Sequence, residues 1–203
     1  MQVTTSMLTK VGVRSNLAEA FTPYLNAAMA KYNITDVNEV CAFLSQVLHE
    51  SDKLSHLEEG LSYSSADRIK LVFRRLRVLP DSQIATLVKN PVALANAAYA
   101  GVNGNTAADD GWRFRGRGCF QLTGRANYQK ASASIGVDFI SNPDLVAKPE
   151  GACLTAAWFW VSQGVQEKAR AGDYLACTRL INGSAMLGKQ EREALRLQLL
   201  ASV

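Results

Sequence analysis

Residues 36–49 constrain the fold more than any other stretch of this 203-residue sequence. Apolar side chains recur there at spacings of three and four, the period of one buried face of an α-helix. They are Val37, Val40, Cys41, Leu44, Val47 and Leu48. Asp36 precedes them and can accept hydrogen bonds from the first free amides of the helix, as an N-cap. Because a helix with one apolar face must bury it, this stretch predicts a helical core.

The same period predicts helices along most of the chain. Residues 15–30 form one amphipathic helix that packs on the core. Asn90–Pro91 has the order of an N-cap followed by a first helical residue. Ser64 or Ser65 can cap a helix that turns inward Ile69, Val72, Phe73 and Leu76, and Asp81 can cap the next one. Further helices are expected over residues 124–135, 150–163, 173–181 and 190–200.

Residues 100–118 break this pattern. They are rich in Gly, Asn and Asp, and from Trp112 onward basic and other residues alternate. We predict a long loop followed by a short, irregular β-ribbon, with Arg113, Arg115 and Arg117 on one of its faces. A loop of this length in a compact domain usually has a function. With so little strand elsewhere, the fold class is mainly α.

Composition narrows the classes of function. The net charge of +4 is mild, and suits an anionic polymer such as a bacterial cell wall as well as a weak nucleic-acid binder. The four cysteines, Cys41, Cys119, Cys153 and Cys177, contain no CxxC pair, and we predict buried free thiols. Only His49 and His56 could serve as histidine ligands, so a three-ligand zinc site, and with it a metal-dependent amidase or peptidase, is not expected. No cofactor is implied.

The N-terminal residues lack a long apolar segment after a basic start, and no run of about 18 apolar residues occurs. We therefore expect synthesis in a cytoplasm, no signal peptide and no stable insertion into a membrane.

Two glutamates, Glu50 and Glu59, stand in the string HESDKLSHLEEGLSYSS. Hydrolysis of a glycosidic bond needs one protonated and one ionised carboxyl group, about 6.5–9.5 Å apart in inverting enzymes. On one continuous helix, nine residues advance about 13.5 Å and end on the opposite face. The pair therefore requires the helix to end soon after Glu50, which Ser51, Asp52 and Gly60 allow. Glu58 is an alternative to Glu59.

The positions of the two glutamates suggest their roles. Glu50 lies at the C-terminal, negative end of an apolar helix, which disfavours its ionisation and makes it the better general acid. Glu59 lies in a polar turn and is the better general base.

Four segments resemble family 19 glycoside hydrolases, the chitinase-like lysins. Residues 43–51 (FLSQVLHES) are similar to the family's "FLAQ…HES", and residues 59–64 (EGLSYS) to its "ENLNYS". Tyr99, Gly104 and Asn105, followed by residues 110–118 (DGWRFRGRG) and 121–128 (QLTGRANY), resemble "Y…GN…DGWRYRGRG..QLTGR.NY". Residues 181–183 (ING) with Arg192 resemble "INGG…R". The similarity runs from about residue 40 to the C-terminus.

The resemblance implies a lysozyme-like, two-lobed helical fold with a substrate groove. From the length of the chain we expect residues 1–203 to form a single catalytic domain, without a separate wall-binding domain. The resemblance also implies hydrolysis with inversion. By position, Glu50 matches the acid, Glu59 the base, and Thr123 the hydroxyl residue that orients water. Arg192 matches an arginine near the acid, and Gln121 and Asn127 match groove residues.

Each of these residues also has a purely structural interpretation. Thr123 could be a helix N-cap. The amides of Gln121 and Asn127 could hold the fold together instead of contacting sugars. Tyr63, Tyr99 and Trp112 could stack on sugar rings or pack in the core.

The chain departs from the family pattern at several positions. Gly60 and Ser62 replace two asparagines beside the base, residues 101–103 (GVN) replace "NRM", and Ser184 replaces a glycine. These changes affect subsite contacts and substrate choice.

Together these features predict a phage endolysin that cleaves the β-1,4 bond of peptidoglycan. We expect a monomer that binds peptidoglycan and no nucleic acid, made in the host cytoplasm and acting in the periplasm after release through a holin. Alternatives are a chitinase acting on N-acetylglucosamine polymers, a lytic transglycosylase, and a non-catalytic wall-binding module.

Overall fold

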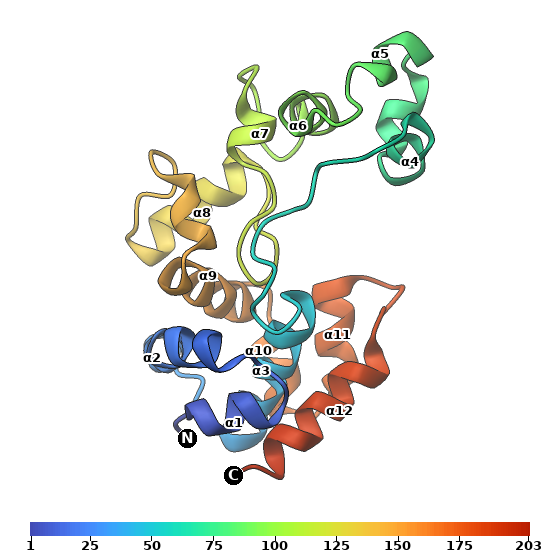
Figure 1. Ribbon diagram of the computed structural model, residues 1–203. Coiled ribbons are helices and arrows are strands. Elements are labelled where there is room, and N and C mark those ends of the chain that lie inside the picture. The colour runs from blue at the N-terminus through green and yellow to red at the C-terminus, as the bar shows by residue number, and fades with distance from the viewer. The chain divides into compact units, whose positions relative to one another are not determined.

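The computed structural model describes residues 1–203 and divides into two compact units (Figure 1). Unit 1 consists of Met1–Leu57, Gly118–Phe120 and Asp144–Val203. Unit 2 consists of Glu58–Arg117 and Gln121–Pro143. Both are built almost entirely from helices, which confirms the predicted mainly α fold class. No helix is both long enough and apolar enough to cross a bilayer.

Unit 1 holds the larger hydrophobic core, with the helix after Asp36 at its centre. Its α-helices are α1 (Thr5–Lys10), α2 (Ser15–Lys31), α3 (Val37–Glu50), α9 (Pro149–Ser162), α10 (Val165–Arg170), α11 (Tyr174–Asn182) and α12 (Lys189–Leu200). The 3-10 helix η2 (Pro143–Ala147) leads into α9. The helices predicted around residues 15–30, 150–163, 173–181 and 190–200 are thereby confirmed. The sequence interpretation missed α1 and α10.

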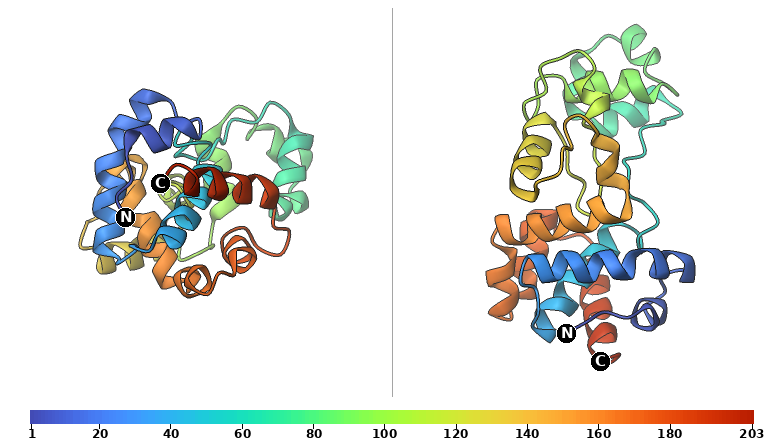
Figure 2. Two further views of the ribbon diagram at one scale, coloured as in Figure 1. Left: turned by 90° about the horizontal axis from the view of Figure 1, so that it is seen from below. Right: turned by 90° about the vertical axis from the view of Figure 1, so that its left-hand side faces the viewer.

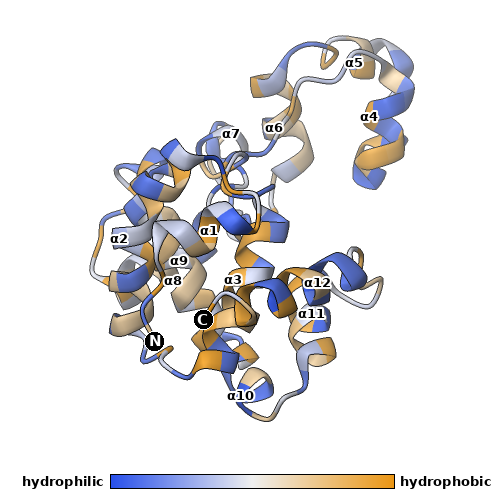
Figure 3. Cartoon of the chain, turned by 60° about the horizontal axis from the view of Figure 1, so that its bottom comes forward, coloured by the Kyte–Doolittle hydropathy of each residue, from blue (hydrophilic) through white to orange (hydrophobic).

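Helix α3 is buried along nearly its whole length. Asp36 caps it as predicted, because its carboxylate accepts the amides of Asn38 and Glu39 at 2.9 and 3.0 Å. The α12 helix packs along α3 (Figure 1), and α2 runs beside α9 (Figure 2). Hydrophilic and hydrophobic residues alternate along α12 in Figure 3, as expected for a helix with one face on a core. This packing fixes the C-terminal end of α3.

All four cysteines are free and buried, as predicted. Burial raises the pKa of Cys119 to about 12 and that of Cys177 to about 12, so both remain protonated thiols.

Unit 2 has its own, smaller core. Its elements are α4 (Ala66–Val72), the 3-10 helix η1 (Arg74–Val78), α5 (Asp81–Ala85), α6 (Pro91–Tyr99), α7 (Asp110–Arg113) and α8 (Arg125–Ile135). Ser65 caps α4 and Asn90 caps α6, both as predicted. Apolar residues of α4, η1, α5 and α6 pack together, with Tyr63, Tyr99 and Trp112 against them.

Two expectations about this region were wrong. Asp81 does not cap α5: Pro80 occupies that position, and the Asp81 carboxylate instead accepts a hydrogen bond from Lys70. Val72 is exposed rather than turned inward. Leu76 is buried as expected, but it lies on η1, because α4 ends at Val72 and the backbone of Phe73 turns away from helical angles.

The β-ribbon expected after residue 112 is not formed. Trp112 lies on α7, and the following residues make only two isolated bridges, which pair Arg117 with Glu58 and with Leu122. Gly111 explains how α7 packs against α6: a Cβ on this residue would lie 2.3 Å from the carbonyl oxygen of Ala95 on α6. Only glycine lets α7 approach α6 so closely.

Candidate active site

Glu50 is the last residue of α3, and the chain reverses directly after it. Ser51 ends the helix, and Asp52, Lys53 and Leu54 all have left-handed backbone angles, with φ of 46°, 55° and 67°. Three such residues in a row are unfavourable for non-glycine side chains. The requirement that the helix end soon after Glu50 is therefore met by a strained turn.

Buried contacts hold this turn in place. The Ser51 hydroxyl donates to the carbonyl of Val47 at 2.7 Å and accepts the amide of Leu54 at 2.9 Å. The amide of His56 donates to the Ser51 carbonyl at 2.8 Å, and the Leu54 side chain is buried in the core. The strain is thus offset by hydrogen bonds and by burial of an apolar side chain.

The Glu50 carboxylate forms an ion pair with Arg192, whose Nη2 lies 2.5 Å from Oε1. Arg192 comes from α12 and is buried, which places it beside Glu50 as the family resemblance implied. The carboxyl group at the C-terminal end of α3 thus has a cationic partner. Next to it, His49 contacts Glu191 at 3.2 Å, and burial together with Arg192 lowers the pKa of His49.

Glu59 lies in unit 2 and is held at both carboxylate oxygens. The Tyr99 hydroxyl donates to Oε1 at 2.5 Å, and the Gly116 amide makes a longer contact of 3.4 Å with Oε2. The backbone of Glu59 also donates to the Gly116 carbonyl at 2.9 Å. Burial, followed by the hydrogen bond to Glu59, raises the pKa of Tyr99 far above its usual value. Tyr99 therefore remains a hydrogen-bond donor to this carboxylate.

Gln121 and Thr123 converge with Glu59 over Gly116. A Cβ on Gly116 would lie 2.6 Å from Gln121 Oε1, 3.2 Å from Thr123 Oγ1 and 3.3 Å from Glu59 Oε2. Thr123 is not a helix N-cap, because Gly124 occupies that position and no side chain caps α8. Its hydroxyl donates instead to the Gln121 carbonyl at 2.9 Å. The two polar residues predicted from sequence thus lie beside Glu59.

Glu58 has a different partner. Its side chain is half-exposed and pairs with Arg115 at 2.5 Å. The Arg115 guanidinium also lies 3.9 Å from the centre of the Trp112 ring, a cation–π contact. Trp112 packs on the core of unit 2. Of the two neighbouring glutamates, Glu59 is the one that lies near Thr123.

The aromatic residues assigned to sugar stacking are engaged within unit 2. Phe73 makes edge-to-face contacts with Tyr63 and with Tyr99, at centroid distances of 5.5 and 6.3 Å. Burial and the nearby Glu59 raise the pKa of Tyr63. The bond from Tyr99 to Glu59 could not be foreseen, because forty residues separate the two.

The arginines of the GRG segment do not form an exposed basic face. Arg117 is buried and donates to the Arg113 carbonyl at 2.8 Å and to the Tyr128 hydroxyl at 3.2 Å. Arg113 donates to the Ile140 carbonyl at 3.0 Å. The prediction that the three arginines share one face of a ribbon is not confirmed, because only isolated bridges form here. Asn127 donates to the Thr123 carbonyl at 2.8 Å, and so holds the backbone beside the candidate hydroxyl.

The loop between α6 and α7 is fixed by buried polar groups that the sequence interpretation missed. Asp110 is fully buried, pairs with Arg125 at 2.9 and 2.5 Å, and accepts the amides of Thr106 and Ala107. Asn105 is also buried and donates to the Tyr99 carbonyl at 3.0 Å. These contacts fix the backbone of Tyr99, and through it the donor to Glu59.

Comparison with known proteins identifies the family. Residues 87–195 match the model of family 19 glycoside hydrolases described as "Chitinase class I". A Haemophilus influenzae protein described as a glycosyl hydrolase family 19 domain-containing protein is 32% identical over 162 residues, 78% of each chain. Acidic endochitinase Q of Nicotiana tabacum is 45% identical over 65 residues, 32% of this chain and 24% of that protein.

Solved structures show the same fold. Chitinase C of Streptomyces griseus aligns with a TM-score of 0.61 at 20% identity, over 98% of this chain and 76% of that one. A bacterial family 19 chitinase aligns with a TM-score of 0.62 at 21% identity, over 97% and 94% of the two chains. The protein is a glycoside hydrolase of the chitinase type. It belongs to glycoside hydrolase family 19.

Proposed function

We propose that this enzyme is an endolysin that hydrolyses the β-1,4-glycosidic bond of bacterial peptidoglycan with inversion. Glu50 is the general acid, Glu59 the general base, and Thr123 orients the attacking water. The observation that carries the assignment is the group around Gly116, where Glu59 Oε2 and Thr123 Oγ1 lie close to the same point.

The hydrogen bonds that Thr123 and Glu59 already make leave acceptors available for a water molecule. The single proton of the Thr123 hydroxyl is directed to the Gln121 carbonyl, so its oxygen presents only lone pairs to a water molecule. Glu59 Oε1 accepts from Tyr99, and Oε2, which has only the long contact with the Gly116 amide, can accept a further hydrogen bond. A water that donates one hydrogen to each acceptor directs its own lone pair outward, toward a sugar carbon. Glu59 then takes the proton as the bond to carbon forms.

Glu50 would supply a proton to the leaving sugar oxygen. Its position at the end of a buried helix, with Arg192 on Oε1, fixes the carboxyl group in one orientation. Two carboxyl groups with separate tasks are what inverting glycosidases use. A lytic transglycosylase needs no base that activates water, so the Glu59, Tyr99 and Thr123 group favours hydrolysis.

Charge favours peptidoglycan over chitin as the substrate. The chain carries a net charge of +4, and chitin is neutral whereas peptidoglycan carries carboxylates. Chitin hydrolysis remains the second candidate, because plant endochitinases are among the relatives. In this role the enzyme acts as a monomer and reaches the periplasm through a holin.

Digestion of purified peptidoglycan and of colloidal chitin tests the proposal. We expect permeabilised Gram-negative cells to lose turbidity and colloidal chitin to stay intact. Mass spectrometry of the products should find hydrated reducing ends. NMR during the reaction should show that the anomer with inverted configuration forms first. Glu50→Gln and Glu59→Gln should each lose at least about 100-fold in kcat. Anhydro ends, or lysis by both variants at the wild-type rate, would refute the mechanism.

A further inference from the structure

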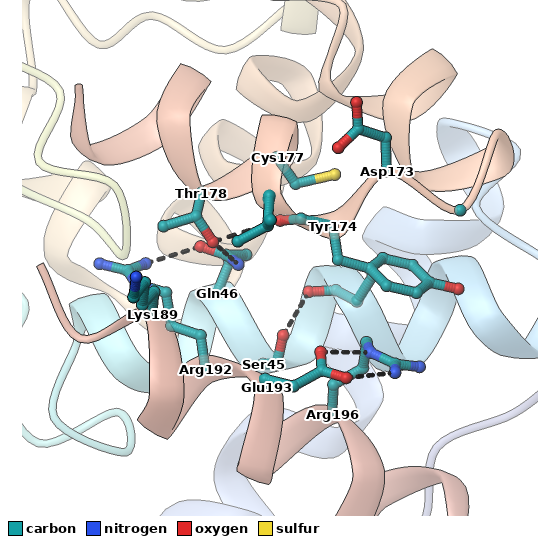
Figure 4. Close-up of a pocket in the computed structure, with 13 residues that line it drawn as sticks. Ser45, Gln46, Asp173, Tyr174, Cys177, Thr178, Lys189, Arg192, Glu193 and Arg196 are labelled. Carbon is teal, nitrogen blue, oxygen red and sulfur yellow. Dashed lines mark hydrogen bonds and ion pairs between the residues drawn. The ribbon is translucent and has the colours of Figure 1, made fainter. Parts of the chain in front are cut away.

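The side chain of Gln46 lies between Arg192 and Thr178 (Figure 4). Because Arg192 pairs with Glu50, Gln46 connects this ion pair to Thr178. Gln46 lies on α3 four residues before Glu50, so the two side chains share one face of the helix. Gln46 Oε1 accepts a hydrogen bond from Arg192 Nη1 at 2.6 Å, and Nε2 donates to Thr178 Oγ1 at 3.1 Å. All three partners are almost completely buried: Gln46 is 3%, Arg192 1% and Thr178 3% exposed.

Thr178 determines which way the Gln46 amide points. Its hydroxyl donates to the Tyr174 carbonyl at 3.3 Å, so its oxygen is free to accept from an amide nitrogen. With Nε2 bound there, the carbonyl oxygen of Gln46 must face Arg192. A reversed amide would direct an N–H group at a guanidinium that has only donors. The orientation of Gln46 is therefore set by chemistry.

Arg192 is held at three points around its planar group. Nε donates to the Leu187 carbonyl at 3.1 Å, Nη1 to Gln46, and Nη2 to Glu50 at 2.5 Å. Because the guanidinium is rigid, the first two bonds determine where Nη2 meets the carboxylate. Without Gln46, only the bond to the Leu187 carbonyl would remain to hold the Arg192 guanidinium in place beside Glu50.

We propose that Gln46 is a positioning residue for the general acid: it holds Arg192, and through Arg192 it fixes Glu50, while Thr178 fixes the orientation of the Gln46 amide. This inference rests on the proposed role of Glu50.

Nearby charged groups do not replace Gln46. A cavity of about 380 Å³ adjoins the network between α3, α11 and α12. Glu193, on its wall, is paired with Arg196 at 2.6 and 2.8 Å. Glu191 contacts His49. Because the pKa of His49 is lowered, its imidazole carries no charge above neutral pH. The alkaline side of a pH profile therefore does not include the titration of His49.

Four variants at the two network positions test the proposal on soluble peptidoglycan fragments. Gln46→Met keeps the length of the side chain but lacks the acceptor. We expect kcat to fall about tenfold with little change in KM, as for a small displacement of a catalytic group. The alkaline decline of kcat should move to higher pH, because a loosened Arg192 stabilises ionised Glu50 less. Gln46→Glu restores an acceptor and should recover most of kcat. Thr178→Val should show a smaller loss, which Thr178→Ser restores.

Ser45→Ala is the matched control. Ser45 adjoins Gln46, is equally buried and lines the same cavity, yet its hydroxyl donates only to the Ala42 carbonyl of its own helix. It should keep the kcat and pH profile of the wild type. A Gln46→Met enzyme with wild-type kcat and profile would overturn the proposal. So would equal losses in Gln46→Met and Ser45→Ala without a shift in profile, since both would then reflect stability alone.

An NMR titration of the Glu50 carboxyl carbon, without substrate, separates this inference from the proposed function. We expect a higher midpoint in Gln46→Met than in the wild type, whether or not Glu50 is catalytic. An unchanged midpoint overturns the positioning role even if Glu50→Gln is inactive. Full activity of Glu50→Gln, with a shifted midpoint, would instead refute Glu50 as the acid and leave the physical link to Gln46 intact.

Discussion

The Tyr99 hydroxyl donates a hydrogen bond to Glu59 Oε1 across 2.5 Å. The backbone carbonyl of Tyr99 in turn accepts a hydrogen bond from the Asn105 side chain. A donor at this oxygen holds the carboxylate in one orientation. It also leaves Oε2 as the oxygen directed toward Thr123 and Gly116. Tyr99, for which the sequence allowed either sugar stacking or core packing, is thus a partner of the candidate base.

Tyr99→Phe should therefore lower activity without unfolding the protein. The aromatic ring keeps its contact with Phe73, while Glu59 loses a charge-assisted hydrogen bond. We expect kcat to fall about tenfold at neutral pH, because the carboxylate of Glu59 is no longer held in one orientation. Rates measured between pH 4 and 9 test this. Tyr63→Phe is the control, because its ring also contacts Phe73 but no hydrogen bond joins it to Glu59. Equal profiles for both variants would contradict the role of Tyr99.

Gly116→Ala should block the space in front of Glu59. The added methyl group would come within 2.6 Å of Gln121 Oε1 and near Thr123 and Glu59, and the tip of a flexible side chain can move away. We expect activity to fall at least about tenfold, since the water and sugar positions are displaced. The melting temperature should change little. Gly60→Ala is the matched control, because no atom lies within 4 Å of its added methyl group. A fully active Gly116→Ala enzyme would show that the reacting water binds elsewhere.

The sequence predicted those parts of the fold that depend on local patterns. Asp36 and Asn90 cap helices because their side chains reach amides two or three residues away. The end of α3 after Glu50 was foreseen from poor helix formers, although three left-handed residues in succession were not. The prediction of a β-ribbon was wrong because it considered only the alternation of basic and other residues. Gly111 lets a helix pack against α6, which is a property of tertiary structure.

The candidate site was predicted less completely, for a physical reason. Glu59, Thr123 and Gln121 were recognised from their motifs, but the bonds that orient them join distant parts of the chain. Tyr99 reaches Glu59 across forty residues, and Arg192 reaches Gln46 across 146. The spacing of four between Gln46 and Glu50 was a usable signal, since it places both on one face of α3. The family resemblance indicated that Arg192 lies near Glu50, but nothing local indicated that Arg192 also binds Gln46.

Asp110→Asn should destabilise unit 2 in a pH-dependent way. Hydrogen bonds from Arg125 hold the pKa of Asp110 well below its ordinary value of 3.8. Because the folded pKa is the lower one, the stabilisation is fully present above the ordinary value and is lost as the pH falls toward the folded value. We expect Asp110→Asn to lower the free energy of unfolding by about 2 kcal/mol at pH 7. The loss should be smaller than for a fully buried ion pair, because Arg125 is partly exposed. Urea unfolding at pH 7 and pH 3 should show a smaller difference at pH 3. Asp109→Asn, at an exposed neighbour, should match the wild type at both values. A difference independent of pH would exclude the ion pair as its cause.

Lys53→Gly should stabilise the turn that follows Glu50. Lys53 has a φ of 55°, a conformation that costs a residue with a Cβ about 1 kcal/mol and glycine much less. Glycine also increases the entropy of the unfolded chain, so the net gain should be about 0.5 kcal/mol. Lys31→Gly is the opposite control, because Lys31 is exposed at the end of helix α2, where glycine should destabilise by a similar amount. Thermal unfolding measures both changes. If Lys53→Gly is stabilised but loses activity, the strained turn serves to position Glu50; if it is destabilised, the left-handed geometry is not a source of strain in this chain.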